Sequence, residues 1–341
     1  MTGRSHIPPG CVVVTGPTAT GKTRLAVALA RAFDGEIIGA DSRQVYRGMD
    51  IGTGKDLGEY GSGEARIPCH LIDVAAPTEE YNLHRFLDDA TEAFLRIRSR
   101  NHLPLVVGGT PLYIHALVSG YELRGTGRDP RLRAELAELE TRELLEILRH
   151  ESPERFSRTD KSQRPRILRA IEIARTEKQA GPFPPAAPWS GVRFLVLAPF
   201  YPRPVIHTRI EDRLRHRLRQ GMLVEVERLR RDGLSWEKLE YFGLEYRWSA
   251  RYLRGGMTHD EYFRRLLARI RRFCRSQEIW FRKMEREGVA IHWLPGGDLG
   301  EAKGLVETFL QGKPVPAPAI QLKDRLYEKR TSRPADRKTL P

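Results

Sequence analysis

The sequence predicts an α/β fold, in which a parallel sheet is flanked by helices and carries a helical insertion domain. Three features of its 341 residues lead to this prediction. A glycine-rich loop lies between an apolar run and a helical pattern within residues 11–33. Further apolar runs at 36–40, 103–107 and 192–197 alternate with helical patterns, whereas residues 124–175 have helical spacing and no strand signal. The alternation is typical of a doubly wound sheet, and the purely helical stretch indicates an insertion.

The glycine-rich loop has the sequence GPTATGKT and matches the G-x-x-x-x-G-K-[ST] phosphate loop, or P-loop. A buried strand at Cys11–Val14 precedes it, and apolar residues at helical spacing follow it, so the flanking structure that the motif requires is present. Glycines allow the backbone N–H groups to surround an anion at the start of the helix. We therefore predict a P-loop NTPase-like core that binds the phosphates of a di- or triphosphate, with Mg²⁺ on the Thr23 hydroxyl and phosphate contacts from Gly16, Thr18, Thr20, Gly21, Lys22 and Thr23.

Two polar residues follow the next apolar runs, where a parallel sheet places its ligand-binding groups. Asp41 comes after residues 36–40, and Thr110 comes after residues 103–107. The residues alone leave three roles open for Asp41: support of a magnesium site, general base for a nucleophile beside the phosphates, or cap of a turn. Nearby, Lys55 ends a glycine-rich loop and could contact an anion, and His70 is expected to have a structural role.

The remaining pattern is mainly helical. Helices are expected at 86–98 and 112–117, and three more within the insertion, where Arg164, Arg166 and Arg169 form either a solvated face or a polyanion contact. A proline-rich linker at 181–191 leads back to the sheet. The pattern then predicts one helix over 205–231, with Arg209, Arg213 and Arg217 spaced by four, and another over 261–287. A last strand is expected at 291–294.

Charge and composition limit the class of protein. The net charge is +14, which indicates a phosphate-rich partner or an arginine-rich surface. The many arginines of the helix at 261–287, among them Arg275, favour an electrostatic contact with nucleic acid. Three separated cysteines fit neither a zinc site nor a disulfide framework. Without a long apolar run or an apolar signal segment, we expect a cytoplasmic protein that does not enter a membrane.

Seven segments occur in one order and carry a family resemblance: GPTATGKT, DSRQVYRGMDIGTGK, HLIDV, LVVGGTPLYIHAL, RILRAIEI, RIEDRLRHRLRQGMLVEV and RSQEIWFR. Together they closely resemble the tRNA dimethylallyltransferase family, whose members prenylate adenosines next to the anticodon. The resemblance covers about residues 11–294. It implies that the phosphate loop holds dimethylallyl diphosphate with Mg²⁺, and that the partner is the anticodon stem-loop of tRNA.

The resemblance also implies roles for single residues. Asp41 would be the general base on the adenine amine, and Thr110 and Arg209 would hold the diphosphate and align the substrates. The tRNA-facing residues would be Asp41, Ser42, Arg43, Gln44, Arg164, Arg166, Arg169 and Arg275.

The chain departs from the family pattern where Gly54-Lys55-Asp56 replaces Ala-Lys-Pro and where Gly243-Leu244 replaces Gly-Tyr. These changes touch the tRNA-facing parts more than the diphosphate site. They leave a free adenine nucleotide as an alternative acceptor. A P-loop kinase of small molecules and an RNA-binding protein without catalysis are further alternatives.

The expected organisation is a monomer with a core in two parts. Residues 1–122 form the first part of the P-loop core, 123–188 the helical, tRNA-facing insertion, 189–311 the second part of the core, and 312–341 a basic, disordered tail.

Overall fold

The computed structural model describes residues 10–120, 130–180, 189 and 191–324. The chain divides into two compact units. The first unit comprises residues 1–119 and 191–341, and the second comprises residues 120–190.

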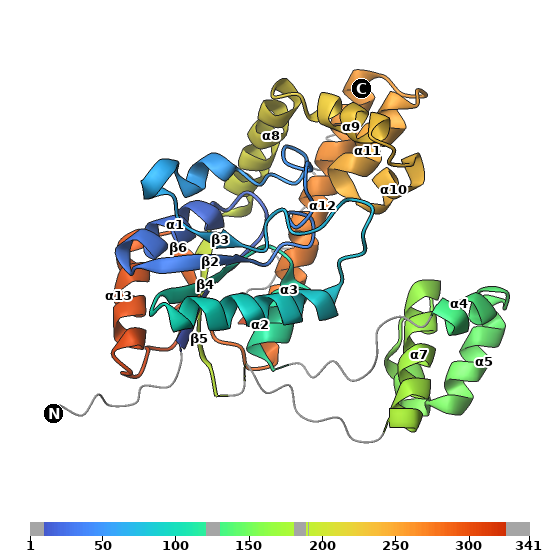
Figure 1. Cartoon of the computed structure of the whole chain (residues 1–341), viewed down its shortest axis with the longest axis horizontal. Coiled ribbons are helices and arrows are strands. Elements are labelled where there is room, and N and C mark those ends of the chain that lie inside the picture. Colours follow the sequence, from blue (N-terminus) through green and yellow to red (C-terminus); the bar gives the residue numbers. More distant parts are fainter. Residues whose placement is uncertain (1–9, 121–129, 181–188, 190, 325–341) are drawn as a thin grey trace, which may run out of the picture. The chain divides into compact units, whose positions relative to one another are not determined.

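A six-stranded sheet forms the centre of the first unit (Figure 1). Its strands lie in the order β3-β2-β4-β1-β5-β6, and every neighbouring pair is parallel. The predicted α/β class and parallel sheet are therefore confirmed. The strands span Gly10–Val14 (β1), Gly35–Gly39 (β2), Cys69–His70 (β3), Leu103–Val107 (β4), Arg193–Phe200 (β5) and Ile291–Pro295 (β6).

Helices cover both faces of this sheet. On one face, α1 (Lys22–Ala32) and α13 (Leu299–Leu310) share one apolar cluster with β1, β2, β4 and β5. On the other face, α2 (Leu83–Ser99) contacts β2 and β4, and α3 (Pro111–Val118) packs beside it. Such two-sided cover explains why β1, β2 and β4 are buried along their whole length.

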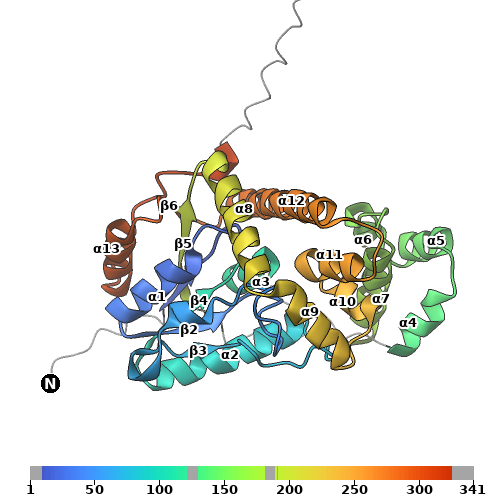
Figure 2. The same cartoon turned by 90° about the horizontal axis from the view of Figure 1, so that it is seen from above.

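A separate group of helices packs around its own apolar core in the first unit (Figures 1 and 2). Its members are α8 (Arg203–Arg219), α9 (Met222–Arg231), α11 (Leu244–Leu253) and α12 (His259–Arg286), and α10 (Trp236–Tyr241) packs on α9 and α11. The prediction of one helix over 205–231 is wrong. Gly221 has φ of 94°, which a right-handed helix does not accept, so the chain turns there and starts α9. The helices α10, α11 and α13 were not predicted from the sequence.

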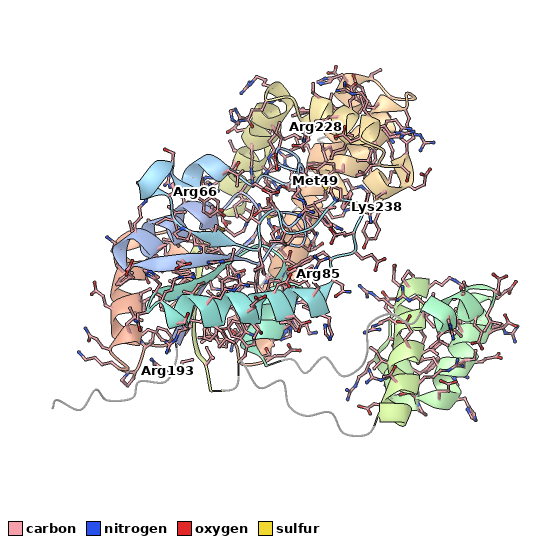
Figure 3. All side chains as sticks on the ribbon, viewed as in Figure 1. Met49, Arg66, Arg85, Arg193, Arg228 and Lys238 are labelled. Carbon is pink, nitrogen blue, oxygen red and sulfur yellow. The ribbon has the colours of Figure 1, made fainter. Side chains whose placement is uncertain are left out.

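This helical layer holds two loops, one that follows β2 and one that follows β3 (Figure 3). Arg228 Nη2 donates to Gly48 O at 2.5 Å, next to Met49, and Lys238 Nζ donates to Glu79 O at 3.3 Å. Because these bonds join residues more than a hundred positions apart, both loops are fixed by tertiary contacts.

The C-terminal segment has more order than the sequence suggests. Leu322 is 6% exposed, and Glu285 of α12 accepts hydrogen bonds from Leu322 N at 3.1 Å and Lys323 N at 2.7 Å. Burial of Leu322 and the hydrogen bonds to the buried carboxylate of Glu285 therefore fix the position of the chain up to Asp324. This segment is ordered although its composition is polar. The prediction of a disordered tail from residue 312 is wrong for this part, and 325–341 lie outside the described residues.

The second unit is entirely helical where the structure describes it. It contains α4 (Pro130–Ala137), α5 (Thr141–Glu151), α6 (Pro153–Arg158) and α7 (Arg164–Ala180). Leu144, Leu148, Ile167 and Ile171 are fully buried and form its core. Most of the linker predicted at 181–191 lies outside the described residues. Across the described part of both units, no helix is long and apolar enough to cross a membrane.

Candidate active site

The phosphate loop connects β1 to α1 and leaves the start of α1 open. Gly21 precedes the helix in the left-handed conformation, with φ of 79°, and no side chain caps the first turn. Thr20 is 1% exposed, and its hydroxyl donates to Pro17 O at 2.9 Å, which closes the loop on itself. Helix N–H groups without partners and without a nearby acid attract anions. The loop is therefore already shaped for a phosphate.

A cavity of about 500 Å³ lies against this loop. We call it the loop cavity. Lys22 and Asp41 reach it from the first half of the first unit, and Arg209 reaches it from α8. Three side chains predicted to act together thus line one cavity. Thr20, Gly21 and Thr23 line it as well, whereas Gly16 lines neither this cavity nor the next and serves the turn of the loop with φ of 135°.

A second cavity of about 260 Å³, here called the inner cavity, shares four residues with the loop cavity: Lys22, Asp41, Gln44 and Arg213. Its own lining includes Thr18, Ser42, Arg43, Thr110 and Gln277. The two cavities therefore adjoin at Asp41. A group bound on one side of this carboxylate can meet a group bound on the other.

Neighbouring strands bring Asp41 and Thr110 together. Gly108 makes the close approach possible, because a Cβ atom there would overlap the backbone of Ala40. Thr110 Oγ1 accepts a hydrogen bond from Ser42 N at 2.9 Å. Asp41 Oδ1 accepts from Arg43 N at 3.0 Å, so the turn-capping role is present, but within the described residues Oδ2 has no hydrogen-bond partner. That oxygen is available to a ligand.

Lys22 is desolvated in the space between the two cavities. Burial and, to a smaller extent, the positive charge of Arg213 lower the pKa of its ammonium to about 8, while the carboxylate of Asp41 acts in the opposite direction. An anion bound in the loop cavity would raise the pKa of Lys22 again, because it would stabilise the charged ammonium.

The arginine row of α8 has three different environments. Arg209 lies over the ring of Tyr201 at 3.8 Å and lines the loop cavity. Arg213 donates to Thr18 Oγ1 at 3.4 Å and to Asp56 Oδ2 at 3.1 Å. Arg217 is 7% exposed and pairs with Glu245 at 3.2 Å. The sequence analysis assigned a role to Arg209 only. The spacing by four was the signal that could have added Arg213.

Gln277 of α12 is a further polar residue that the sequence analysis did not single out. It is 3% exposed. Its Oε1 accepts from Thr18 N at 2.9 Å, and its Nε2 donates to Gly109 O at 2.6 Å. One amide therefore connects the phosphate loop to the turn that carries Thr110. No local pattern distinguishes it from the other polar residues of α12.

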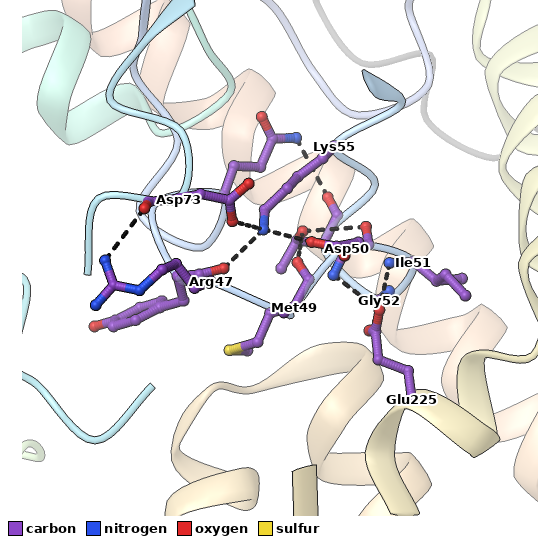
Figure 4. Close-up of polar contacts among 12 residues, drawn as sticks. Arg47, Met49, Asp50, Ile51, Gly52, Lys55, Asp73 and Glu225 are labelled. Carbon is purple, nitrogen blue, oxygen red and sulfur yellow. Dashed lines mark hydrogen bonds and ion pairs between the residues drawn. The ribbon is translucent and has the colours of Figure 1, made fainter. Parts of the chain in front are cut away.

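The loop of residues 49–56 is held by two buried charges (Figure 4). Glu225 accepts from the N–H groups of Asp50 at 2.8 Å, Ile51 at 2.7 Å and Gly52 at 3.0 Å. Lys55 Nζ, fully enclosed, contacts Asp50 Oδ1 at 2.6 Å, Tyr46 O at 2.7 Å and the carboxylate of Asp73. Lys55 therefore has protein partners and lines neither cavity, so the predicted contact with an anion is not supported.

This loop presents Gly54 to the arginine row. Gln44 Nε2 donates to Gly54 O at 2.9 Å, and Arg213 Nη2 contacts the same oxygen at 3.4 Å. Gly54 has φ of 65°, and a Cβ atom there would overlap the guanidinium groups of Arg213 and Arg217. Glycine thus lets the loop approach α8 with both guanidinium groups in these positions, and an alanine there would displace them.

The residues predicted to face tRNA fall in both units. Ser42, Arg43 and Gln44 line the inner cavity, and Arg275 is exposed on α12. The other three lie on α7 of the second unit and have partners there. Arg164 Nη2 donates to Ala137 O at 2.8 Å and Leu139 O at 2.6 Å, at the end of α4. Arg166 pairs with Asp160 at 3.1 Å, and Arg169 pairs with Glu172 at 3.0 Å.

A metal held by protein side chains alone finds no support in the described residues, where no group of three His, Cys, Asp or Glu residues could bind one. A metal that binds jointly to phosphate needs fewer protein ligands. The Thr23 hydroxyl lines the loop cavity and has no hydrogen-bond partner among the described residues, and the Oδ2 atom of Asp41 is also available. This oxygen set fits a phosphate-bound Mg²⁺.

Family models match most of the chain. The model described as IPP transferase matches residues 44–284, and the model described as isopentenyl transferase matches residues 9–71. Among individual proteins, the chain is similar to tRNA dimethylallyltransferase 2 of Trichlorobacter lovleyi, with 47% identity over 84% of this chain and 92% of the relative. It is also 47% identical to tRNA dimethylallyltransferase 2 of Syntrophotalea carbinolica, over 88% of this chain and 98% of the relative.

Solved structures of related transferases also match the chain. The tRNA isopentenylpyrophosphate transferase of Bacillus halodurans matches with a TM-score of 0.62 and 28% identity, over 89% of this chain and 96% of that one. A eukaryotic dimethylallyltransferase acting on tRNA matches with a TM-score of 0.73 and 21% identity, over 90% and 81% of the two chains, which supports the fold.

Proposed function

We infer the reaction of this chain from the premise that it belongs to the tRNA dimethylallyltransferase family. The chain transfers a dimethylallyl group from dimethylallyl diphosphate to the exocyclic amine of an adenosine adjacent to the anticodon in tRNA. The observation that carries this proposal is the common cavity of Lys22, Asp41 and Arg209. In this cavity the cations Lys22 and Arg209 can stabilise a leaving diphosphate, and the carboxylate of Asp41 can accept a proton from an amine.

The donor occupies the loop cavity. The N–H groups at the start of α1 and the ammonium of Lys22 bind the diphosphate, and Arg209 and Arg213 approach it from α8. As the allylic C–O bond breaks, negative charge grows on the departing diphosphate. Fixed cations in a desolvated site stabilise that charge more in the transition state than in the ground state.

The acceptor adenine enters the inner cavity. Its amine nitrogen forms the new bond to the allylic carbon, the electron pair of the C–O bond leaves with the diphosphate, and the amine proton passes to Asp41. The free Oδ2 atom of Asp41, at the junction of the two cavities, supports this role. Thr110 holds the turn that carries Asp41 through its bond to Ser42 N.

Mg²⁺ fits the free hydroxyl of Thr23 in the loop cavity, which leaves the free oxygen of Asp41 to the amine. When bound, it supplies further charge neutralisation to the diphosphate.

The tRNA partner agrees with the net charge of +14 and with the arginines near the inner cavity. A base in a single-stranded anticodon loop is extruded more easily than a paired one, which suits a closed acceptor site. The residues assigned to the reaction need no contribution from a second chain, so we propose that the protein acts as a monomer. Its tRNA substrate places it in the cytoplasm.

The test is direct. The protein is incubated with dimethylallyl diphosphate and Mg²⁺, with either unmodified tRNA or AMP, and the products are analysed by mass spectrometry. We expect one added dimethylallyl group on tRNA. Transfer to AMP but not to tRNA would overturn the acceptor assignment, and phosphate transfer from ATP without prenylation would indicate a kinase.

A further inference from the structure

A cluster of aromatic and cationic side chains lies beside the inner cavity, outside the residues assigned to the reaction. Tyr241 and Phe242 end α10, and Arg43 and Lys238 lie over both rings. We call these four side chains the aromatic rim. They come from two segments almost two hundred residues apart, so only the tertiary structure assembles them.

The two rings of the rim have different environments. Phe242 is 3% exposed, lines the inner cavity, and packs edge-on against Tyr46 with ring centroids 5.0 Å apart. Tyr241 is 50% exposed, and within the described residues its hydroxyl has no hydrogen-bond partner. Phe242 is therefore part of the core, whereas a face of Tyr241 remains available to a ligand.

The cations of the rim also differ. Lys238 Nζ lies 5.4 Å from the Tyr241 centroid and donates to the backbone oxygens of Thr78 and Glu79. Arg43 Cζ lies 5.6 Å from the same centroid, and its guanidinium has no hydrogen-bond or ion-pair partner in the described part of the chain. Its five donors can therefore bind a phosphate while the ring contact holds its position.

An exposed aromatic ring next to an unpaired guanidinium fits one chemistry well, namely a nucleobase and its phosphate. Single-stranded RNA is bound by stacking of unpaired bases on aromatic side chains, combined with arginine contacts to the backbone. The rim adjoins the cavity that would receive the extruded adenosine, because Arg43 and Phe242 line that cavity. A neighbouring nucleotide of the same strand would reach Tyr241.

We propose that Tyr241 is a stacking platform for the unpaired base that flanks the target adenosine, with Arg43 on the intervening phosphate. This inference rests on the proposed function, since it requires a single-stranded RNA with one base in the inner cavity. It adds a binding subsite that selects for a loop nucleotide over a free adenine nucleotide.

Binding of a synthetic anticodon stem-loop tests the proposal without chemistry. 2-Aminopurine is placed on the 5′ or the 3′ side of the target adenosine, and its fluorescence and the Kd are measured with the full chain. For wild type we expect quenching of the probe on one side. Tyr241→Ala is expected to raise the Kd at least about fivefold and abolish the quenching, whereas Tyr241→Phe keeps both within about twofold.

Trp236→Ala is the matched control, because Trp236 begins the same helix, lies under Arg230 and lines neither cavity. It should bind the stem-loop as wild type does, and all variants should keep the Kd for dimethylallyl diphosphate. If wild type prenylates the stem-loop but Tyr241→Ala keeps the wild-type affinity for it and the wild-type quenching, the stacking role of Tyr241 is wrong. A wild type that neither binds nor prenylates the stem-loop would overturn the proposed function, and the platform with it.

Discussion

The side-chain oxygen of Gln277 accepts a hydrogen bond from Thr18 N at 2.9 Å, across 259 positions of sequence. The same amide donates to Gly109 O at 2.6 Å. A helix from the far end of the chain thus sets the distance between the phosphate loop and the strand end that carries Thr110.

Replacing Gln277 with alanine should loosen the phosphate loop. The buried Gly109 O and the partly buried Thr18 N would lose their partner, which costs about 1–3 kcal/mol for a buried polar group. We expect weaker binding of dimethylallyl diphosphate, about tenfold or more by calorimetry. Ser276→Ala is the control, because the Ser276 hydroxyl bonds only to Arg272 O and is exposed. Equal affinity in both variants would mean that the loop keeps its shape without Gln277.

Asp41→Asn should separate binding from chemistry. The amide keeps the turn bond from Arg43 N but cannot accept the amine proton. We expect a fall in kcat of about 10²- to 10⁴-fold, with little change in the Kd for the diphosphate. Near wild-type turnover would remove the general-base role. A large loss of Mg²⁺-dependent diphosphate affinity would point to metal binding instead.

Diphosphate affinity should depend on the charge of Lys22. In the free protein the pKa of Lys22 is lowered to about 8, and a bound diphosphate favours the charged form. Binding therefore takes up a proton above pH 8, and the affinity should fall by up to about tenfold per pH unit there. The Kd is measured between pH 6.5 and 9.5. Lys22→Arg stays charged over this range, so its profile should be flatter. Equal slopes of the Kd against pH in wild type and in Lys22→Arg would show that the charge of Lys22 does not cause the pH dependence.

Asp56 should oppose diphosphate binding. Its carboxylate pairs with Arg213 at 3.1 Å and lines the loop cavity, so a diphosphate must compete with it for the guanidinium. Asp56→Asn is expected to tighten diphosphate binding a few-fold at low salt, because one negative charge leaves the cavity. Weaker binding in the presence of Mg²⁺ would instead identify Asp56 as a metal ligand.

Lys55→Met should destabilise the fold. Removing a fully enclosed ammonium leaves the carboxylates of Asp50 and Asp73 facing each other without a cation. We expect a loss of about 2–3 kcal/mol in the free energy of unfolding, below the value for a fully buried pair because both carboxylates are partly exposed. Urea unfolding measures it, with Lys313→Met, at an exposed lysine, as control. Unchanged stability with lost diphosphate affinity would restore the anion-binding role.

Much of the sheet is predictable because its signals are local. Buried parallel strands are short apolar runs, and β1, β2 and β4 appear as such in the sequence. The long helix α12 is predictable from its apolar spacing. The break at Gly221 was missed because one glycine interrupted an otherwise continuous stripe. The short helices α10 and α11 were missed because their stability comes from tertiary packing, of α10 on α9 and α11 and of α11 on α12.

The sequence alone determined the phosphate loop, the position of Asp41 and Thr110 at strand ends, and the family, because each depends on residue types at fixed spacing. Only the tertiary structure decided that Arg213 and Gln277 contact the phosphate loop. It also decided that Lys55 pairs with two carboxylates and that Arg43 lies over the ring of Tyr241. Those contacts join distant segments, and their geometry depends on how helices pack around the sheet, which no local pattern contains.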